Sequence, residues 1–175
     1  LDPATTVVID PGMAFGTGDH PTTRGATRLM QEVVHPGLVV ADLGAGSAVL
    51  SIAAAKLGAS RVFAVEYDAD AISNAEENVE RNAVEGIVHV FEGDATVFLP
   101  LVAPVDVVVA NIISSVLVEL LPAMHAALRP GGHAVLAGIL LEEKEFMLEA
   151  LHSDGWRLER EDVEDVWWSI TIAKA

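Results

Sequence analysis

A chain of 175 residues is long enough for one domain with a buried core, and 51% of its residues are hydrophobic. The absence of cysteine excludes disulfides and thiolate chemistry, and no apolar stretch is long enough to span a bilayer. Ten basic against 26 acidic residues give a net charge of −16, which repels nucleic acid and either favours a cationic partner or only aids solubility. We therefore expect a cytoplasmic protein that binds no membrane and makes no direct contact with nucleic acid.

Strand and helix patterns alternate along the chain, which predicts an α/β fold with a parallel sheet covered on both faces. The last two strands are joined by a short acidic link, so the final strand is expected to be antiparallel. Together these features predict a doubly wound, seven-stranded, Rossmann-like sheet that is mostly parallel. The expected helices are His20–Val34, Val49–Leu57, Ala69–Asn82, Ser114–Leu128 and Glu142–His152. The expected strands are Leu38–Leu43, Arg61–Glu66, Val88–Glu92, Val105–Ala110, His133–Ala137, Trp156–Glu161 and Val166–Ala173.

The segment before the first strand, residues 10–24, reads DPGMAFGTGDHPTTR and is too rich in glycine and proline for a regular element. Such a loop before a helix folds over a ligand as a lid, or is an ordinary surface connection. In a lid, Phe15 would exclude water and Asp19 would attract an ammonium group. The alternatives are that Phe15 pins the loop to the core and that Asp19 is merely exposed. The amides and hydroxyls that open the following helix would contact a carboxylate.

Two apolar runs give the strongest indication of function in this sequence. The first, Val39–Leu43, leads into Gly44 and Gly46, and about twenty residues later the second run ends in Glu66. This pattern predicts a strand, a tight glycine turn and a second strand that presents a carboxylate to a ribose. Such an arrangement is typical of a nucleoside-cofactor site on a parallel sheet. A glycine turn alone has a purely structural interpretation, because tight strand-to-helix turns need glycine.

The glycine spacing distinguishes between cofactors. A dinucleotide fingerprint requires a third small residue where this chain has Val49. With Asp42 two residues before Gly44, the turn instead resembles the E/D-x-G-x-G-x-G loop of class I S-adenosylmethionine-dependent methyltransferases. Ala48 stands in place of the third glycine and adds one methyl group. The resemblance implies that Gly46 approaches the cofactor closely and that Asp42 helps to orient its ammonium end.

Polar residues follow two further strands. Asp94, after the third strand, is placed to accept from an adenine amino group, or it caps the local backbone. Asn111 follows four apolar residues, at the carboxyl end of a central strand where open sheets bind ligands. Its side-chain carbonyl and the backbone carbonyl of Ile112 would accept the protons of an amine. Alternatively, Asn111 caps the next helix.

Five segments carry a closer resemblance: DPGMAFGTGDHPTT, DLGAGSAVLSIAAAKLGA, VEYDADAISNAEENVERN, VVVANII and WWSITIAKA. They closely resemble the bacterial methyltransferases that modify large-subunit ribosomal protein eleven, over essentially the whole chain from residue 10. A seven-stranded sheet with a terminal hairpin is the methyltransferase variant of the doubly wound fold. The resemblance implies that Thr23, Gly44, Glu66 and Asn111 contact S-adenosylmethionine.

Two features depart from this family. Asp19 stands where the family usually has threonine. The family also usually has a separate N-terminal domain that grips the substrate, which we do not find in residues 1–175. We interpret the chain as one domain, with a lid and helix in residues 1–36 and a core in residues 37–175. It would then be the catalytic part of such an enzyme or a stand-alone relative.

The sequence therefore predicts an S-adenosylmethionine-dependent N-methyltransferase that acts on lysine or N-terminal amines of proteins, a ribosomal protein among them. The closest alternative acceptor is another protein lysine or a small amine. A nucleic-acid methyltransferase and a dehydrogenase-type nucleotide binder are the other classes to test. The six histidines show no paired ligand spacing, so no metal site is expected. The oligomeric state is left open.

Overall fold

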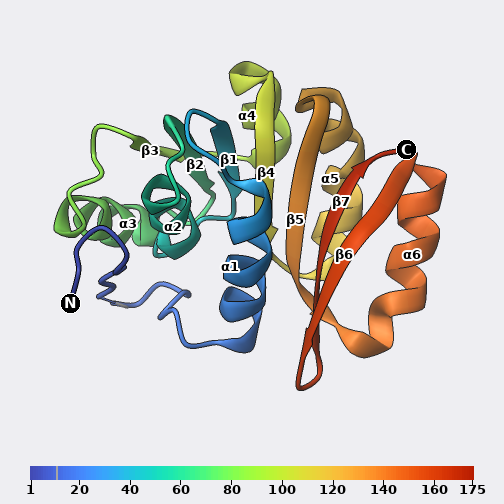
Figure 1. Cartoon of the computed structure of the whole chain (residues 1–175), viewed down its shortest axis with the longest axis horizontal. Coiled ribbons are helices and arrows are strands. Elements are labelled where there is room, and N and C mark those ends of the chain that lie inside the picture. The colour runs from blue at the N-terminus through green and yellow to red at the C-terminus, as the bar shows by residue number, and fades with distance from the viewer. Residues whose placement is uncertain (11) are drawn as a thin grey trace.

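The computed structural model describes residues 1–10 and 12–175, so Pro11 of the lid segment lies outside the described residues. It contains one seven-stranded sheet in the order β3-β2-β1-β4-β5-β7-β6 (Figure 1). The strands are β1 (Val39–Leu43), β2 (Arg61–Glu66), β3 (Val88–Glu92), β4 (Val105–Asn111), β5 (Leu128–Leu140), β6 (Trp156–Glu164) and β7 (Trp167–Lys174). The helices are α1 (Pro21–Val33), α2 (Val49–Lys56), α3 (Ala69–Arg81), α4 (Ala95–Val102), α5 (Ser114–Ala127) and α6 (Lys144–Ser153), with a 3₁₀ turn η1 (Leu141–Glu143).

The first five strands are parallel, and β7 is antiparallel to both of its neighbours, β5 and β6. The predicted fold class is thereby confirmed. The order reverses between β1 and β4, and this switch point is where open α/β sheets bind their ligands, beyond the carboxyl ends of the strands.

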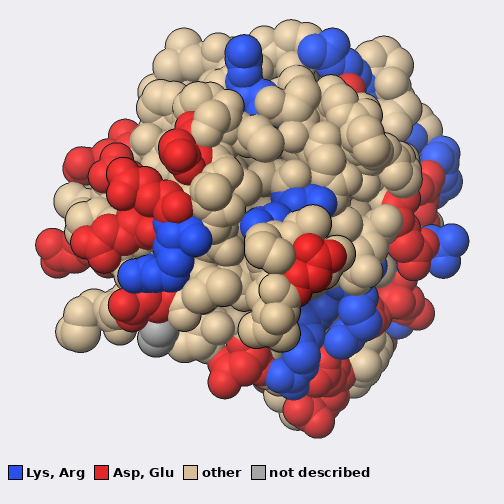
Figure 2. All heavy atoms as spheres, turned by 60° about the vertical axis from the view of Figure 1, so that its left-hand side comes forward, with Lys and Arg blue, Asp and Glu red and all other residues tan. Residues whose placement is uncertain are grey.

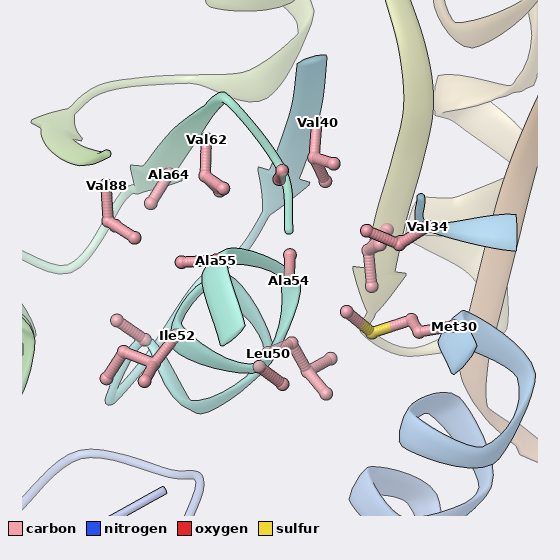
Figure 3. Packing of buried hydrophobic residues seen from close by; sticks show 14 of the residues in the cluster. Met30, Val34, Val40, Leu50, Ile52, Ala54, Ala55, Val62, Ala64 and Val88 are labelled. Carbon is pink, nitrogen blue, oxygen red and sulfur yellow. The ribbon is translucent and has the colours of Figure 1, made fainter. Parts of the chain in front are cut away.

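Helices cover both faces of the sheet because the central strands are apolar on both sides. Residues of α1, α2 and α3 pack on one face, with Met30, Leu50 and Ile52 against Val40 and Val62 (Figure 3). Residues of α4, α5 and α6 pack on the other face. This two-sided burial explains the continuous apolar runs in the sequence. Among the described residues, no helix combines the length and the apolar character needed to cross a bilayer.

One helix was missed, and the start of one strand was predicted too late. Helix α4 was missed because it is only eight residues long, is apolar around most of its circumference and contains Pro100, so it lacks helical periodicity. Strand β5 begins at Leu128, whereas the sequence predicted a start at His133. Leu128 pairs with Val105, and pairing resumes at His133 with Val107, so residues 129–132 form a bulge within the strand. Arg129 in this bulge forms a 3.3 Å ion pair with Asp106.

Candidate active site

The turn between β1 and α2 forms the floor of the site. Gly44 and Gly46 have φ values of +72° and +56°, which L side chains rarely adopt. A Cβ on Gly44 would lie 2.7 Å from the Ile112 side chain, and one on Gly46 would lie 2.6 Å from the Phe15 carbonyl oxygen. Glycine is therefore required at both positions, because the backbone has a positive φ and because a side chain would collide with Ile112 or Phe15. Ala48 also has a positive φ, +68°, so its departure from glycine costs conformational strain of about 1 kcal/mol.

Glu66 joins this turn to the end of β2. Its Oε2 accepts the Gly46 N–H at 2.7 Å, and its Oε1 accepts the Asp68 N–H at 2.9 Å. The carboxylate is half-buried and lines a cavity of about 290 Å³ at the carboxyl ends of β1, β2 and β4. The cavity therefore presents a carboxylate fixed by two backbone N–H groups, beside glycines that carry no side chain.

The cavity combines apolar walls with acidic edges. Val65, Ile112 and Leu120 line it together with Glu66 and Asp94. Apolar side chains suit the faces of a nucleobase, and carboxylates suit the hydroxyl and amino donors of a nucleoside. The arrangement thus fits a nucleoside ligand.

Asn111 ends β4 beside this cavity. Its Nδ2 donates to the Thr22 hydroxyl at 3.2 Å, which brings the N-terminus of α1 to the switch point. The α5 helix begins after Ile113, so Asn111 does not cap it. Its neighbour Ile112 lines the cavity, whereas Asn111 itself is not among the lining residues.

The comparisons with known proteins agree with this geometry. Residues 2–175 match the profile of the family described as ribosomal protein L11 methyltransferase (PrmA). The chain is 42% identical over 171 residues to a ribosomal protein L11 methyltransferase of Symbiobacterium thermophilum, covering 94% of this chain and 53% of the relative. A relative of the same description from Streptococcus mutans is 38% identical over 168 residues, covering 96% and 52%. The chain belongs to this family.

A crystal structure of a ribosomal protein L11 methylase from Lactobacillus delbrueckii matches with a TM-score of 0.85 at 30% identity. The match covers 96% of this chain and 84% of that one. The chain spans about half the length of the curated relatives that it matches. The predicted resemblance to the L11 methyltransferase family is thereby confirmed.

Asp42 lies near the end of β1 and is not among the residues that line the cavity. It is 2% exposed and accepts a 2.6 Å hydrogen bond from the Ser51 hydroxyl of α2. Burial raises the pKa of its carboxyl group to about 6, and the negative charge of Glu66 adds to this effect, whereas the Ser51 bond opposes it. The expected role of Asp42 in orienting the ammonium end of the cofactor stays a prediction.

Asp94 caps α4, which is one of the two roles that the sequence predicted for it. Its Oδ1 accepts from both the backbone N–H (2.7 Å) and the hydroxyl of Thr96, and these bonds lower the pKa of its carboxyl group. The same residue lines the cavity. The cap therefore fixes its orientation, and the contact with adenine stays a prediction.

The two threonines that open α1 have different surroundings. Thr23, the predicted cofactor contact, is 2% exposed, and its hydroxyl oxygen has no partner among the described residues. A buried hydroxyl without a partner is unfavourable unless a ligand satisfies it. Thr22 was not singled out from the sequence, yet it is the threonine that contacts Asn111. Only its place beside Thr23 in the motif hinted at this role.

The lid segment lies directly on the glycine turn. The Phe15 carbonyl accepts the Ser47 N–H at 3.0 Å, and the Ser47 hydroxyl donates to the Gly16 carbonyl at 2.5 Å. The Phe15 side chain is 60% exposed and contacts the His20 ring edge-on, with ring centroids 5.5 Å apart. The segment is thus anchored by its backbone, and the Phe15 ring lies against His20 although most of it is exposed.

Asp19 is exposed, and its roles within the lid are local. Its carboxylate accepts from the Thr17 hydroxyl, which lowers the pKa of the carboxyl group, and its carbonyl accepts from Arg24. The attraction of an ammonium group by Asp19 stays a prediction. In the described part of the chain, no group of three or more His, Asp or Glu side chains is arranged to hold a metal ion.

Charges on the surface are grouped rather than uniform. Figure 2 shows acidic side chains in groups towards the left, right and bottom of the face it presents, with basic side chains beside them and a broad uncharged area between. Several of the basic residues are in ion pairs, among them Arg24 with Glu164 and Arg28 with both Asp162 and Glu164. Pairing of this kind leaves less basic surface available for a polyanion.

Proposed function

We propose that this chain transfers a methyl group from S-adenosylmethionine to an amine of a protein, either a lysine ε-amine or an N-terminal α-amine. One observation carries the proposal: two carbonyl oxygens, Asn111 Oδ1 and Ile112 O, lie together beside Gly138, next to the cavity lined by Glu66. They lie 3.1 and 2.6 Å from the position that a Cβ on Gly138 would occupy. A pair of acceptors beside a nucleoside cavity suits a primary amine, which has two protons to donate.

The cofactor would be held by residues of the glycine turn and of the neighbouring strand ends. Glu66 would accept from the ribose hydroxyls, Asp94 would accept from the adenine amino group, and Gly44 and Gly46 would let the backbone approach. Thr23 has a buried hydroxyl that a carboxylate acceptor would satisfy. Asp42 would act through the backbone of the turn. When bound, S-adenosylmethionine supplies a methyl group activated by its sulfonium.

The acceptor amine would be held by this chain's own carbonyl groups. Asn111 Oδ1 and Ile112 O would accept its protons, which leaves the nitrogen lone pair free and aimed along one direction. The Phe15 ring and the lid would exclude water from the reacting atoms. Asp19 would attract the amine in its charged form before it gives up a proton to solvent.

A ribosomal protein is the substrate that family membership favours, because the relatives are named for methylation of ribosomal protein L11. Ribosomal proteins are rich in lysine, and the net charge of −16 would favour their approach. The reaction would then take place in the cytoplasm, where ribosomes are assembled. Another lysine-bearing protein or a small amine is the alternative acceptor.

The proposal is tested in two stages. Calorimetric titration with S-adenosylmethionine and with NAD should show binding of the first only, and NAD binding in its place would overturn the assignment of the cofactor. Purified ribosomal protein L11, an unrelated basic protein and small amines are then compared as acceptors by mass spectrometry. Asn111→Ala should lower the methylation rate by 10-fold or more when S-adenosylmethionine is saturating. Methylation of none of these acceptors, or of added RNA in their place, would contradict the proposal.

A further inference from the structure

The orientation of the Asn111 amide decides what an incoming amine meets. A side-chain amide has a carbonyl oxygen on one side and an NH₂ group on the other. In the structure Nδ2 is engaged by the Thr22 hydroxyl at 3.2 Å, so Oδ1 faces the Gly138 side, together with the Ile112 carbonyl. Gly138 has no side chain to cover these oxygens. A flipped Asn111 would place N–H donors there, where they would bind the nitrogen lone pair that the reaction needs.

A directed chain of hydrogen bonds holds Thr22 in the matching orientation. The Thr22 backbone N–H donates to His20 Nδ1 at 3.2 Å, so this ring nitrogen acts as an acceptor. The Thr22 hydroxyl lies 2.7 Å from the same nitrogen and therefore donates its proton to it. The hydroxyl oxygen is left with lone pairs only, which suit the Asn111 NH₂ group and reject its carbonyl.

Two aromatic side chains contact the His20 ring. Its centroid is 5.5 Å from that of Phe15 and 5.3 Å from that of Trp167, and both contacts are edge-on. The lid, helix α1 and strand β7 therefore meet at one imidazole. Rings in these edge-on positions restrict rotation of the imidazole, and with it the direction of the hydrogen-bond chain.

We propose that Thr22, itself oriented by His20, is a positioning residue that sets the amide of Asn111 so that its carbonyl faces the acceptor amine. This inference rests on the proposed function. It assigns to the first threonine of the HPTT motif a role in acceptor geometry, separate from the cofactor contact expected of Thr23.

Two variants of nearly the same shape test the proposal. Thr22→Val removes the hydroxyl and keeps the volume, whereas Thr22→Ser keeps the hydroxyl. We expect Thr22→Val to lower kcat for the protein amine by about 10-fold or more, which corresponds to the loss of one positioning hydrogen bond. Its affinity for S-adenosylmethionine should change by less than about two-fold, and Thr22→Ser should restore most of kcat. Thr27→Val is the control, because it removes another hydroxyl of α1 that donates to the Thr23 carbonyl.

A spectroscopic readout makes the test independent of activity. The side-chain ¹⁵N–¹H signals of Asn111, assigned by their loss in Asn111→Asp, should shift in Thr22→Val and stay near their original position in Thr22→Ser. Unshifted signals together with an unchanged kcat in Thr22→Val would overturn the inference. Loss of cofactor affinity in Thr22→Val would also overturn it, by placing Thr22 in the cofactor site. If the parent chain methylates no amine, the proposed function fails, and the NMR signals still decide whether Thr22 orients Asn111.

Discussion

The two halves of the site are built in different ways. The proposed cofactor half, formed by the glycine turn, Glu66 and Asp94, comes from neighbouring strand–turn–helix units, and its central contact joins Gly46 to Glu66 only 20 residues away. The acceptor half joins Thr22 to Asn111 across 89 residues and also needs Trp167 of β7. The first half is therefore specified by local backbone conformation, and the second by how distant elements pack.

The acceptor half depends on the docking of α1 against the β6–β7 hairpin. Arg24 pairs with Glu164, and Arg28 pairs with Asp162 and Glu164 at 2.7 Å each. These pairs are partly exposed, so each is a modest contribution that salt weakens. The comparison implies that changes in the hairpin alter the acceptor half and leave the cofactor half intact, whereas changes in the turn do the reverse.

The largest effect is expected from Glu66→Ala, which breaks the cofactor half. It removes the carboxylate proposed to hold the ribose and also the acceptor of the Gly46 N–H. Charge-assisted hydrogen bonds are worth about 1.5 to 3 kcal/mol each, so the Kd for S-adenosylmethionine should rise by about 100-fold or more. Calorimetry measures this change. Glu92→Ala is the matched control, since Glu92 ends the neighbouring strand in register with Glu66, and an equal loss in both variants would refute the assignment.

A smaller effect, on stability, is expected from Asp42→Asn. Because the pKa of the folded state is raised to about 6 from 3.8, the charged form disfavours folding above pH 6, and the protein gains stability as the pH falls from 6 towards 4. Asp42→Asn should therefore stabilise the chain by about 1 to 2 kcal/mol at pH 7.5 and by much less at pH 4. Urea unfolding at both pH values measures the difference. A variant that is less stable at pH 7.5 would show that the charge is compensated within the turn.

The smallest effect is expected from Glu164→Gln at the hairpin. The hydrogen bonds from Arg24 and Arg28 lower the pKa of the Glu164 carboxyl group to about 2 from 4.5. Its ion pairs therefore stabilise the fold fully above about pH 4.5, and this contribution is lost as the pH falls towards 2. The Tm of Glu164→Gln should lie slightly below that of the parent at pH 7 and converge with it near pH 2. Glu149→Gln, at an exposed position of α6, is the control, and a constant Tm difference across this range would contradict the prediction.

The residues of the proposed cofactor half could be selected from the sequence because each follows from a local rule. Glycines with positive φ mark the turn, and Glu66 ends an apolar run at the distance that a βαβ unit requires. The sheet, its antiparallel last strand and the family followed from the same patterns. Helix α4 was missed for the converse reason, since its helical form depends on packing and on the Asp94 cap rather than on periodicity.

By itself, the sequence determined the order of the strands and of the α-helices other than α4, the glycine turn and the acid that faces it, because these depend on the conformational preferences of consecutive residues. Tertiary structure alone decided that Thr22 rather than Thr23 contacts Asn111, that His20 lies between Phe15 and Trp167, and that Asp42 turns towards Ser51. The physical reason is that a hydrogen bond between side chains depends on differences of an ångström in how separate helices and strands pack. No local pattern encodes those differences.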